Sequence, residues 1–257
     1  MRMKTKIALC ISGEPRSSMF CYPYIYESFI NLGDEYEVDV FIHSRKNYRA
    51  VKLYNPIKYF LDTPKPSYLK EVYNNLSLPK ELSDNAAFLL SFSEQSSYLF
   101  NQLLMLDGII KSFSLTQDDN NKKYDIYIRC RPDFMTSNHI WLNSIFNDIL
   151  DKKYDMLIPS KSFERGSIAE EHSKKEYNDQ LAIGNYKSML CYCNTINNLS
   201  YLITKTKEFR AEHWLKAQLD EGGIKVKNEF IPLSLIRGTR VYSNRIWEGF
   251  DQDFSDE

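Results

Sequence analysis

Two arginines and an aspartate follow an apolar run and could together bind a charged ligand. The sequence of residues 124–133 is YDIYIRCRPD, which predicts a buried strand with Arg129, Arg131 and Asp133 at its carboxyl end. In an extended chain the side chains alternate between two faces, so these three residues are expected on one face. Guanidinium groups can bind diphosphate oxygens through two hydrogen bonds, and a carboxylate can hold a divalent cation that bridges the same phosphates.

The same three charges also have a purely structural explanation. Charged groups at the end of a buried strand are costly unless they meet a ligand or one another. An internal Arg–Asp cluster that closes the strand would meet this requirement without a ligand. We favour ligand binding, because the ligands of open α/β sheets lie at the carboxyl ends of the strands.

The loop at residues 12–18, SGEPRSS, is predicted to join a first strand to the amino terminus of a helix. Backbone N–H groups and the helix dipole favour an anionic or polar ligand at such a place. The loop is not a Walker A motif, because the Gly-Lys-Ser/Thr ending is missing. A simple turn in which Ser17 or Ser18 caps the helix explains the pattern equally well.

Three more polar residues are candidates for the same site. His43 ends the second apolar run and could line a ligand or serve as a hydrogen-bonded structural residue. Asp179 stands between Asn178 and Gln180, whose amides can bind sugar hydroxyls, while the acid can orient or deprotonate one. An Asx-turn before a strand is the alternative for this segment. Glu212 lies in the first turn of a predicted helix, where a carboxylate can act chemically or simply stabilise the helix dipole.

The elements that must position these candidates form an α/β pattern. Residues 6–11, 17–32 and 37–43 predict a strand, a helix and a strand, which make a parallel βαβ unit with a right-handed crossover. Further helices are expected at residues 93–113, 139–150, 186–199 and 211–221, and further strands at 124–129, 156–158, 180–184, 224–226 and 240–242. Residues 44–85 predict loop and short helix that could cover the site, residues 160–178 a mobile loop, and residues 251–257 an acidic flexible tail. We expect a single domain over residues 1–250.

The composition excludes several classes of protein. The 257 residues carry 33 Lys and Arg against 34 Asp and Glu, a net charge of −1, without the basic excess of a nucleic-acid binder. The five cysteines are odd in number and include no C-x-x-C pair, which argues against a disulfide framework or a structural zinc site. No signal-peptide core and no run of about 18 apolar residues is present. We therefore expect a cytoplasmic protein without a transmembrane segment, for which peripheral membrane contact stays open.

Several of these segments together resemble small GT-A-type glycosyltransferases of bacterial capsule and lipopolysaccharide clusters and of large DNA viruses. The resemblance rests on residues 7–16 (IALCISGEPR), 38–44 (VDVFIHS), 129–133 (RCRPD) and 178–180 (NDQ), and on Glu212. It extends over most of the chain, from about residue 6 to residue 243. Its sharpest element is RCRPD, which is similar to the family's Arg-x-Arg-x-Asp in the place of the usual Asp-x-Asp.

The resemblance implies a fold and an activity. The fold is a GT-A-like single domain with a Rossmann-like, mostly parallel sheet flanked by helices. The activity is transfer of a sugar from a nucleotide-sugar donor, with a UDP-sugar favoured, to a glycan or glycolipid acceptor. By this resemblance Ser12, Gly13 and Arg16 would border the nucleotide. Asp179 would face the acceptor or donor sugar, and Glu212 could serve as the base.

Asp133 would be the metal or diphosphate carboxylate by the same resemblance. The chain has Arg131-Pro132-Asp133 and no complete Asp-x-Asp at this place, so a requirement for Mn²⁺ or Mg²⁺ is left open. Arg129 and Arg131 could instead neutralise the leaving diphosphate themselves.

Two other functions fit parts of the sequence. Residues 13–18, GEPRSS, faintly resemble the phosphate loops of sulfotransferases, which use an adenosine phosphosulfate donor and also follow a first strand. This alternative leaves residues 129–133 unexplained. The second alternative is a non-catalytic sugar-binding domain, which would bind glycan unchanged after Asp133→Ala and Asp179→Ala and would not hydrolyse a donor.

Overall fold

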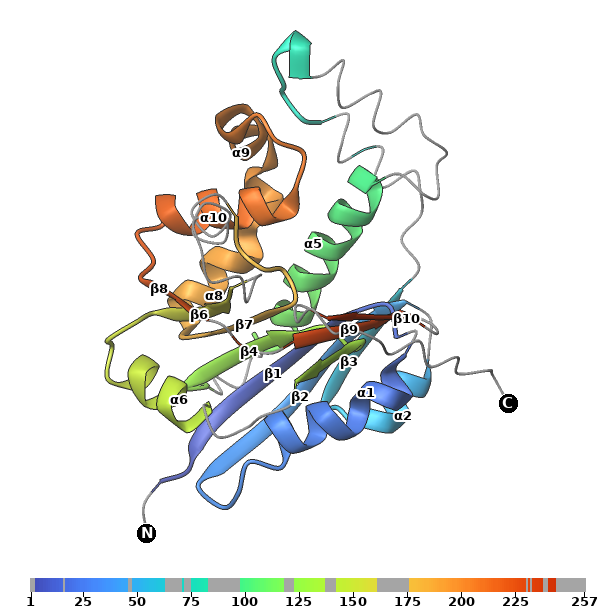
Figure 1. Cartoon of the computed structure of the whole chain (residues 1–257), viewed down its shortest axis with the longest axis vertical. Coiled ribbons are helices and arrows are strands. Elements are labelled where there is room, and N and C mark those ends of the chain that lie inside the picture. The colour runs from blue at the N-terminus through green and yellow to red at the C-terminus, as the bar shows by residue number, and fades with distance from the viewer. Residues whose placement is uncertain are drawn as a thin grey trace.

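The computed structural model describes residues 3–15, 17–45, 48–62, 71, 75–82, 98–117, 123–136, 142–160, 176–229, 231, 233–237 and 240–243. In these residues, seven strands form a central sheet that carries helices on both faces, and three further strands form a second sheet (Figure 1). Among the described helices, none has the length and apolar character that crossing a bilayer requires.

The central sheet has the strand order β3-β2-β1-β4-β7-β6-β8. Its strands are β1 Thr5–Gly13, β2 Tyr36–Arg45, β3 Lys58–Asp62, β4 Ile126–Cys130, β6 Met156–Pro159, β7 Leu181–Gly184 and β8 Val226–Glu229. The neighbours β3, β2, β1 and β4 are parallel, as are β6 and β8, whereas β7 runs antiparallel to both of its neighbours. The prediction of a mostly parallel sheet flanked by helices is therefore confirmed.

The predicted βαβ unit at the start of the chain is confirmed as well. Helix α1 (Ser18–Ile25) continues as the π-helix η1 (Tyr26–Ile30) and connects β1 to its parallel neighbour β2. In β1 the residues Ile7 and Leu9 belong to one apolar core, and Ala8 between them belongs to the other. This alternation follows from the period of two in a strand and lets one buried strand serve both layers of helices.

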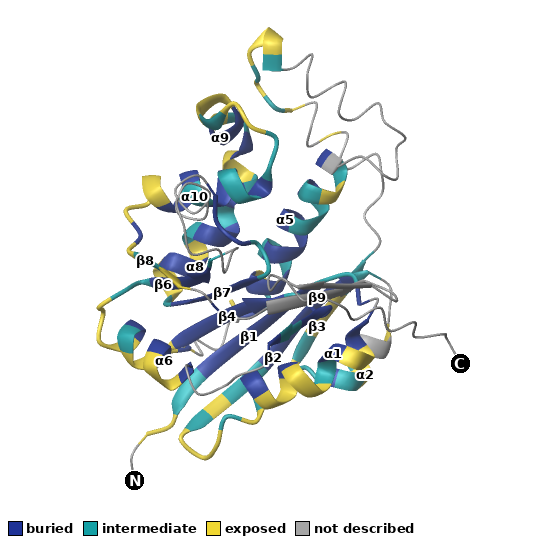
Figure 2. Cartoon of the chain, in the orientation of Figure 1, coloured by how far each residue is buried: buried dark blue, intermediate teal, exposed yellow. Residues whose placement is uncertain are grey.

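The two apolar cores hold the helices against opposite faces of the sheet (Figure 2). The core on one face includes α5 (Tyr98–Ser114), α8 (Tyr186–Cys193), α9 (Leu199–Thr206) and α10 (Ala211–Glu221), of which α5 and α8 lie on the strands and α9 and α10 pack against other helices. The other face is covered by α1, η1 and α6 (Leu142–Leu150). The predicted apolar stripe of α5 lies in the first core, where Leu99, Leu103, Leu106 and Phe113 are buried. The positions of α5 and α6 therefore follow from their amphipathic patterns, whereas α1 has no clear apolar stripe.

Several regions differ from the sequence predictions, among them the strand predicted at residues 224–226, which lies at Val226–Glu229. Residues 44–85 contain a short helix, α2 (Tyr48–Tyr54), as expected, but also the unpredicted strand β3 at the edge of the sheet. No residue of β3 is fully buried, so no apolar pattern marks it. The helix predicted at residues 186–199 ends at Cys193, and the 3₁₀ segment η2 (Asn194–Asn198) separates it from α9. Three asparagines, which are poor helix formers, lie in η2.

The second sheet is antiparallel and has the order β10-β9-β5. Its strands are β5 (Phe134–Thr136), β9 (Leu233–Arg237) and β10 (Arg240–Ser243), of which only β10 was predicted from the sequence. Arg16, residues 161–175 of the predicted mobile loop and the predicted tail at 251–257 lie outside the described residues. A single domain over residues 1–250 stays a prediction.

Candidate functional site

The carboxyl ends of β1, β2 and β4 meet at one edge of the central sheet and bring several predicted site residues together. Ser12 lies opposite His43 in the β1–β2 register, and Cys10 lies opposite Arg129 in the β1–β4 register. Ser12 is 1% exposed, and its Oγ has no hydrogen-bond partner in the part of the chain that the structure describes. A buried hydroxyl without a partner is costly, and a polar ligand group could satisfy it.

Gly13 ends β1 and packs against the turn that follows β4. Its φ angle is +138°, and a Cβ atom at this position would lie 3.1 Å from Cδ of Pro132. Only glycine avoids both the unfavourable backbone angle and the close contact. The loop after β1 and the turn after β4 therefore form one packed unit at the edge of the sheet.

Arg131 and Asp133 form an ion pair across this turn. Arg131 donates from Nε to Oδ1 and from Nη2 to Oδ2, both at 2.8 Å. Asp133 is 1% exposed, and the side chain of Arg131 is 17% exposed. Burial alone would lower the pKa of Arg131, but the hydrogen bonds and charge of Asp133 raise it above its ordinary value. The internal ion pair considered from the sequence is thus present.

Arg129 does not share a face with Asp133, so that part of the sequence prediction is wrong. Strand β4 ends at Cys130, and the alternation of side chains ends with it. The Arg129 guanidinium is buried near Tyr192 and Cys193, where its Nη1 donates to the backbone carbonyl of Asp179. Its Nε has no partner among the described residues.

The charges of Asp133 and Arg129 act mostly on different layers. Burial raises the pKa of Cys21 of α1 and Tyr54 of α2, which pack on the face opposite α5, and the charge of Asp133 adds to this rise. Burial also raises the pKa of side chains of α8, and there the charge of Arg129 opposes the rise. Both charges act on the pKa of Cys130 at the end of β4.

Asp179 links the turn after β4 to the start of β7. Its carboxylate raises the pKa of Arg131, although Asp133 has the larger effect. The next residue, Gln180, accepts the backbone N–H of Arg131 at 3.3 Å, and its own N–H donates to Oδ1 of Asn178 at 2.7 Å. The Asx-turn considered from the sequence is therefore present, and it holds Asp179 beside Arg131.

Glu212 lies at the start of α10 and approaches the same region from the helical layer. Its side chain is 13% exposed, and one carboxylate oxygen lies 4.0 Å from the guanidinium of Arg210. Burial raises the pKa of Tyr192, Arg129 opposes this effect, and the charges of Asp179 and Glu212 add to it. The structure thus gathers Arg129, Asp179 and Glu212 around Tyr192.

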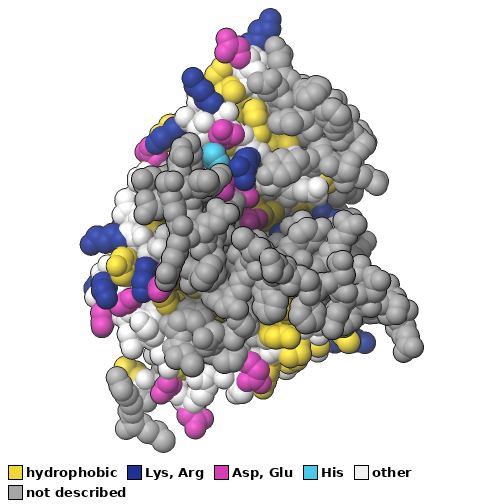
Figure 3. Space-filling model, in the orientation of Figure 1, with side chains coloured by type: hydrophobic (Ala, Val, Ile, Leu, Met, Phe, Trp, Pro, Cys, Tyr) yellow, Lys and Arg dark blue, Asp and Glu magenta, His cyan; other side chains and the backbone are white. Residues whose placement is uncertain are grey.

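A buried glutamate beside Glu212 was not found by the sequence analysis. Glu176 is 6% exposed, and its Oε2 lies 3.0 Å from Nη2 of Arg210 and 3.3 Å from Nε2 of His213. Figure 3 shows histidine, basic and acidic side chains side by side on the face drawn there. Glu176 falls in a charged segment without periodicity, so no local pattern marks it. Together these residues form a charged cluster at the start of α10.

His43 belongs to a buried polar network at the end of β2. Its Nε2 donates to Oδ1 of Asp62 at 3.0 Å, and its ring stacks on Phe60. Nζ of Lys111 lies 2.6 Å from both Asp62 and Asp107. Burial lowers the pKa of His43, while Asp62 opposes that shift. His43 therefore makes a structural hydrogen bond of the kind considered from the sequence, and its role in lining a ligand stays a prediction.

Comparison with solved structures shows which known fold the chain resembles. Core-mannan synthase A from Aspergillus fumigatus, in its Mn/GDP form, superposes with a TM-score of 0.52 and 13% identity, over 95% of this chain and 76% of that chain. The chain has a GT-A-like fold. No protein-family model matches the sequence, and no curated protein matches it in sequence.

Two further solved structures are similar to this GT-A-like chain at lower TM-scores. A provisionally named nucleotide-diphospho-sugar transferase from Desulfovibrio desulfuricans G20 has a TM-score of 0.45 and 10% identity, over 88% of this chain and 80% of that chain. Mouse xyloside xylosyltransferase 1, in its apo form, has a TM-score of 0.35 and 10% identity, over 88% of this chain and 78% of that chain.

Two places with carboxylates in this GT-A-like fold are candidates for binding a metal ion. One ligand atom each of His43, Asp62 and Asp107 lies within 4.8 Å of the others, so these residues could hold a metal ion. The ammonium group of Lys111 bridges both carboxylates, however, and a metal would have to displace it. At the other place, both carboxylate oxygens of Asp133 accept from Arg131. His43, Asp62 and Asp107 therefore stay a candidate metal site that Lys111 occupies, whereas Arg131 occupies the carboxylate of Asp133, and we derive no chemical step through a metal ion.

Proposed function

We propose that this protein is a glycosyltransferase that moves a sugar from a nucleotide-sugar donor to a glycan or glycolipid acceptor. The observation that carries the proposal is the hydrogen bond from the backbone N–H of Arg131 to the carbonyl of Gln180, which holds the segment of Asp179 beside the carboxyl ends of β1 and β4. Open α/β sheets bind their ligands at this edge. The GT-A-like fold supports the same location for the donor.

Arg131 is the residue that we assign to the leaving diphosphate. A guanidinium has five N–H donors, and Asp133 accepts two of those of Arg131. The remaining donors can bind phosphate oxygens while Asp133 holds the guanidinium in place. Positive charge fixed in this way stabilises the negative charge that develops on the leaving group. We expect a UDP-sugar as the donor.

Glu212 is the residue that we assign as the base in an inverting reaction. Asp179 is tied to the Arg131 turn, which is the donor side of the site. Glu212 approaches from α10, and its carboxylate could take the proton of the acceptor hydroxyl. A retaining reaction would not need this base, so the stereochemistry of the product tests the assignment.

The biological setting of the reaction is part of the proposal. We expect a hexosyl or pentosyl residue to be added to a capsule, lipopolysaccharide or viral glycan, in the cytoplasm. A glycolipid acceptor would bring the protein into peripheral contact with a membrane. These expectations rest on the sequence resemblance given above.

Ligand-induced stabilisation and donor turnover test the proposed activity. The melting temperature is measured with UDP, GDP, their sugars and adenosine phosphosulfate, each with EDTA or with Mn²⁺. We expect a nucleotide sugar to raise the melting temperature and to be hydrolysed or transferred, with EDTA leaving both largely unchanged. Stabilisation by adenosine phosphosulfate alone would favour a sulfotransferase. Loss of turnover in EDTA, restored by Mn²⁺, would refute the assignment of Arg131 in place of a metal.

A further inference from the structure

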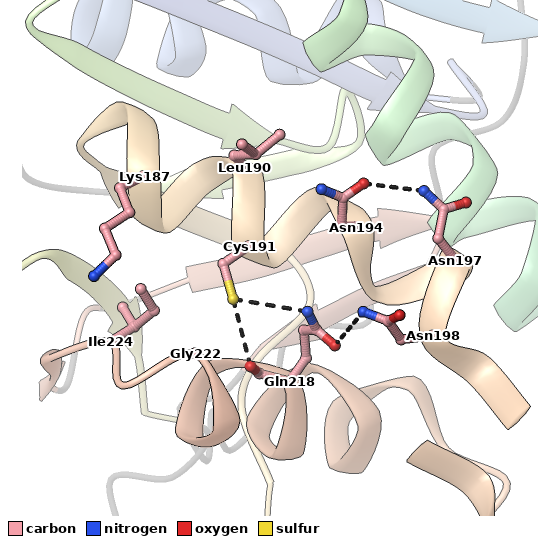
Figure 4. Close-up of a pocket in the computed structure, with 9 residues that line it drawn as sticks. All are labelled: Lys187, Leu190, Cys191, Asn194, Asn197, Asn198, Gln218, Gly222 and Ile224. Atoms are coloured by element: carbon pink, nitrogen blue, oxygen red, sulfur yellow. Dashed lines mark hydrogen bonds between the residues drawn. The ribbon is translucent and has the colours of Figure 1, made fainter. Parts of the chain in front are cut away.

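A cavity of about 420 Å³ lies between α8, η2 and α10 (Figure 4). Its volume is within the range of about 300–1,000 Å³ that small-molecule sites occupy. Four of its lining residues carry carboxamide groups, namely Asn194, Asn197, Asn198 and Gln218. None of the residues predicted for the catalytic site lines this cavity.

The carboxamides are held in two hydrogen-bonded pairs. Nδ2 of Asn197 donates to Oδ1 of Asn194 at 3.0 Å, and Nδ2 of Asn198 donates to Oε1 of Gln218 at 3.0 Å. Gln218 also contacts the Cys191 thiol, which donates to its backbone carbonyl at 3.4 Å. Figure 4 shows the side chains of Asn198 and Gln218 meeting across the space between η2 and α10. The polar groups are thus positioned before any ligand arrives.

Each pair leaves hydrogen-bonding capacity for a ligand. The NH₂ group of Asn194 and the Oδ1 atoms of Asn197 and Asn198 are not used in these two bonds. An amide N–H is a donor and an amide oxygen is an acceptor, so both kinds of group line the cavity. A hydroxyl is a donor and an acceptor at once, and neighbouring hydroxyls can use both kinds together.

The rest of the lining selects against charged and wholly apolar ligands. Lys187 is the one charged residue among those that line the cavity, which is little positive charge for a phosphate or a polyanion. Leu190 and Ile224 add an apolar surface that could contact the C–H groups of a sugar ring. We propose that this cavity binds a neutral carbohydrate.

The position of the cavity relates it to the proposed reaction. Gln218 and Glu212 lie six residues apart on α10, which is about 9 Å along the helix axis. The two residues are also about 120° apart around the axis, so a chain of sugars that follows the surface of α10 around this angle could reach from the cavity toward the start of the helix. We assign the cavity to a part of the glycan acceptor away from the reacting hydroxyl, and this assignment, unlike binding itself, rests on the proposed glycosyltransferase function.

Direct binding tests the cavity without requiring turnover. The full chain is titrated with neutral gluco-, manno- and galacto-oligosaccharides, and binding is followed by calorimetry and by saturation-transfer NMR. We expect saturable binding of at least one series. The double variant Asn194→Ala/Gln218→Ala should weaken it by about 10-fold or more, since two hydrogen-bonding groups are removed. Asn147→Ala, an exposed amide of α6 on the other face of the sheet, should bind as the parent does.

A conservative variant covers the case in which the double variant does not fold. Asn197→Asp replaces by oxygen the NH₂ donor that holds Asn194, at an exposed position. It should therefore fold but lose the prearranged carboxamide pair, and bind more weakly than the control Asn147→Asp. The proposal would be overturned if the parent and the cavity variants bound with equal affinity, or if no neutral oligosaccharide series showed saturable binding. The variant Glu212→Gln tests the carbohydrate-binding cavity separately from the proposed glycosyltransferase function. Loss of transfer with unchanged oligosaccharide binding supports the cavity, and transfer that persists without such binding refutes it.

Discussion

Arg131 donates two parallel hydrogen bonds to Asp133, both 2.8 Å long, across the turn that follows β4. This contact is compatible with both explanations of these charges that the sequence allowed, the structural one and the ligand-binding one. It is an internal ion pair that closes the strand, and it also fixes a guanidinium with further N–H donors at the edge of the sheet. In the proposed reaction, the role of Asp133 is to position Arg131.

The ion pair should contribute strongly to stability. Asp133→Asn removes the charge but keeps the size of the side chain, and it leaves the mostly buried Arg131 without its counter-ion. Breaking a buried pair costs about 3–5 kcal/mol, which urea denaturation would measure as a fall in the free energy of unfolding. The control is Asp220→Asn, because Asp220 pairs with Lys216 but is 51% exposed, and a loss below about 1 kcal/mol is expected. Similar losses in both variants would show that the Arg131 pair is not a structural contact of this strength.

Gly13→Ala should destabilise the protein more than Gly33→Ala. Both glycines have positive φ angles, +138° and +97°, so alanine is strained at either position. Only at Gly13 would the new Cβ also meet a neighbour, at 3.1 Å from Pro132, whereas nothing lies within 4 Å at Gly33. Strain of this kind costs about 1–3 kcal/mol, and the contact with Pro132 adds to it. Thermal unfolding of the two variants measures the difference. If Gly13→Ala lost less stability than Gly33→Ala, the turn after β4 would be able to move away from the new Cβ atom at little cost.

Glu212→Gln should lower kcat by about 10²–10⁴-fold if Glu212 removes the acceptor proton. The amide keeps the shape of the side chain but cannot act as a base, so the KM for the donor should change little. Glu208→Gln, at an exposed position just before α10, is the matched control and should keep the parent kcat. Initial rates at varied donor and acceptor concentrations separate the two constants. If Glu212→Gln kept the kcat of the parent, a different group would have to remove the acceptor proton.

Stability should decline as the pH falls below the ordinary pKa of histidine, because of His43. Burial lowers the pKa of His43 below 6.5, so the folded protein holds the neutral ring. The unfolded chain then binds more protons than the folded one at mildly acidic pH. The contribution of His43 is therefore complete above about pH 6.5 and is lost as the pH falls through the lower folded pKa. Urea denaturation at a series of pH values should show a flatter pH dependence for His43→Asn. An unchanged slope in this variant would assign the effect to other groups.

The local pattern of the sequence was enough to predict the elements that carry a clear period. The run IALCI predicts β1, the apolar stripe of residues 99–113 predicts α5, and Gly222-Gly223 after residues 211–221 marks the end of α10. Parallel pairing of β1 with β2 also followed, because a crossover helix between two short strands leaves little alternative. These features depend on residues that are near one another in the chain.

Other features depend on contacts that no local pattern records. The direction of β7, which runs antiparallel between β4 and β6, is decided by backbone pairing between distant segments. The edge strand β3 has no fully buried residue, and β5 pairs with β9, which lies about a hundred residues further along the chain. Such pairing is chosen by the packing of the whole sheet.

The candidate site also has features that the local sequence predicts and features that only contacts between distant segments explain. The sequence by itself determined which charged residues stand at the ends of apolar runs, and so identified Arg131, Asp179 and Glu212 as candidates. Only the tertiary structure decided that β4 stops at Cys130, which turns Arg129 away from Asp133 and toward Tyr192. The physical reason is that a side chain's face depends on where its strand ends, and its charge partner depends on which distant segments fold against it.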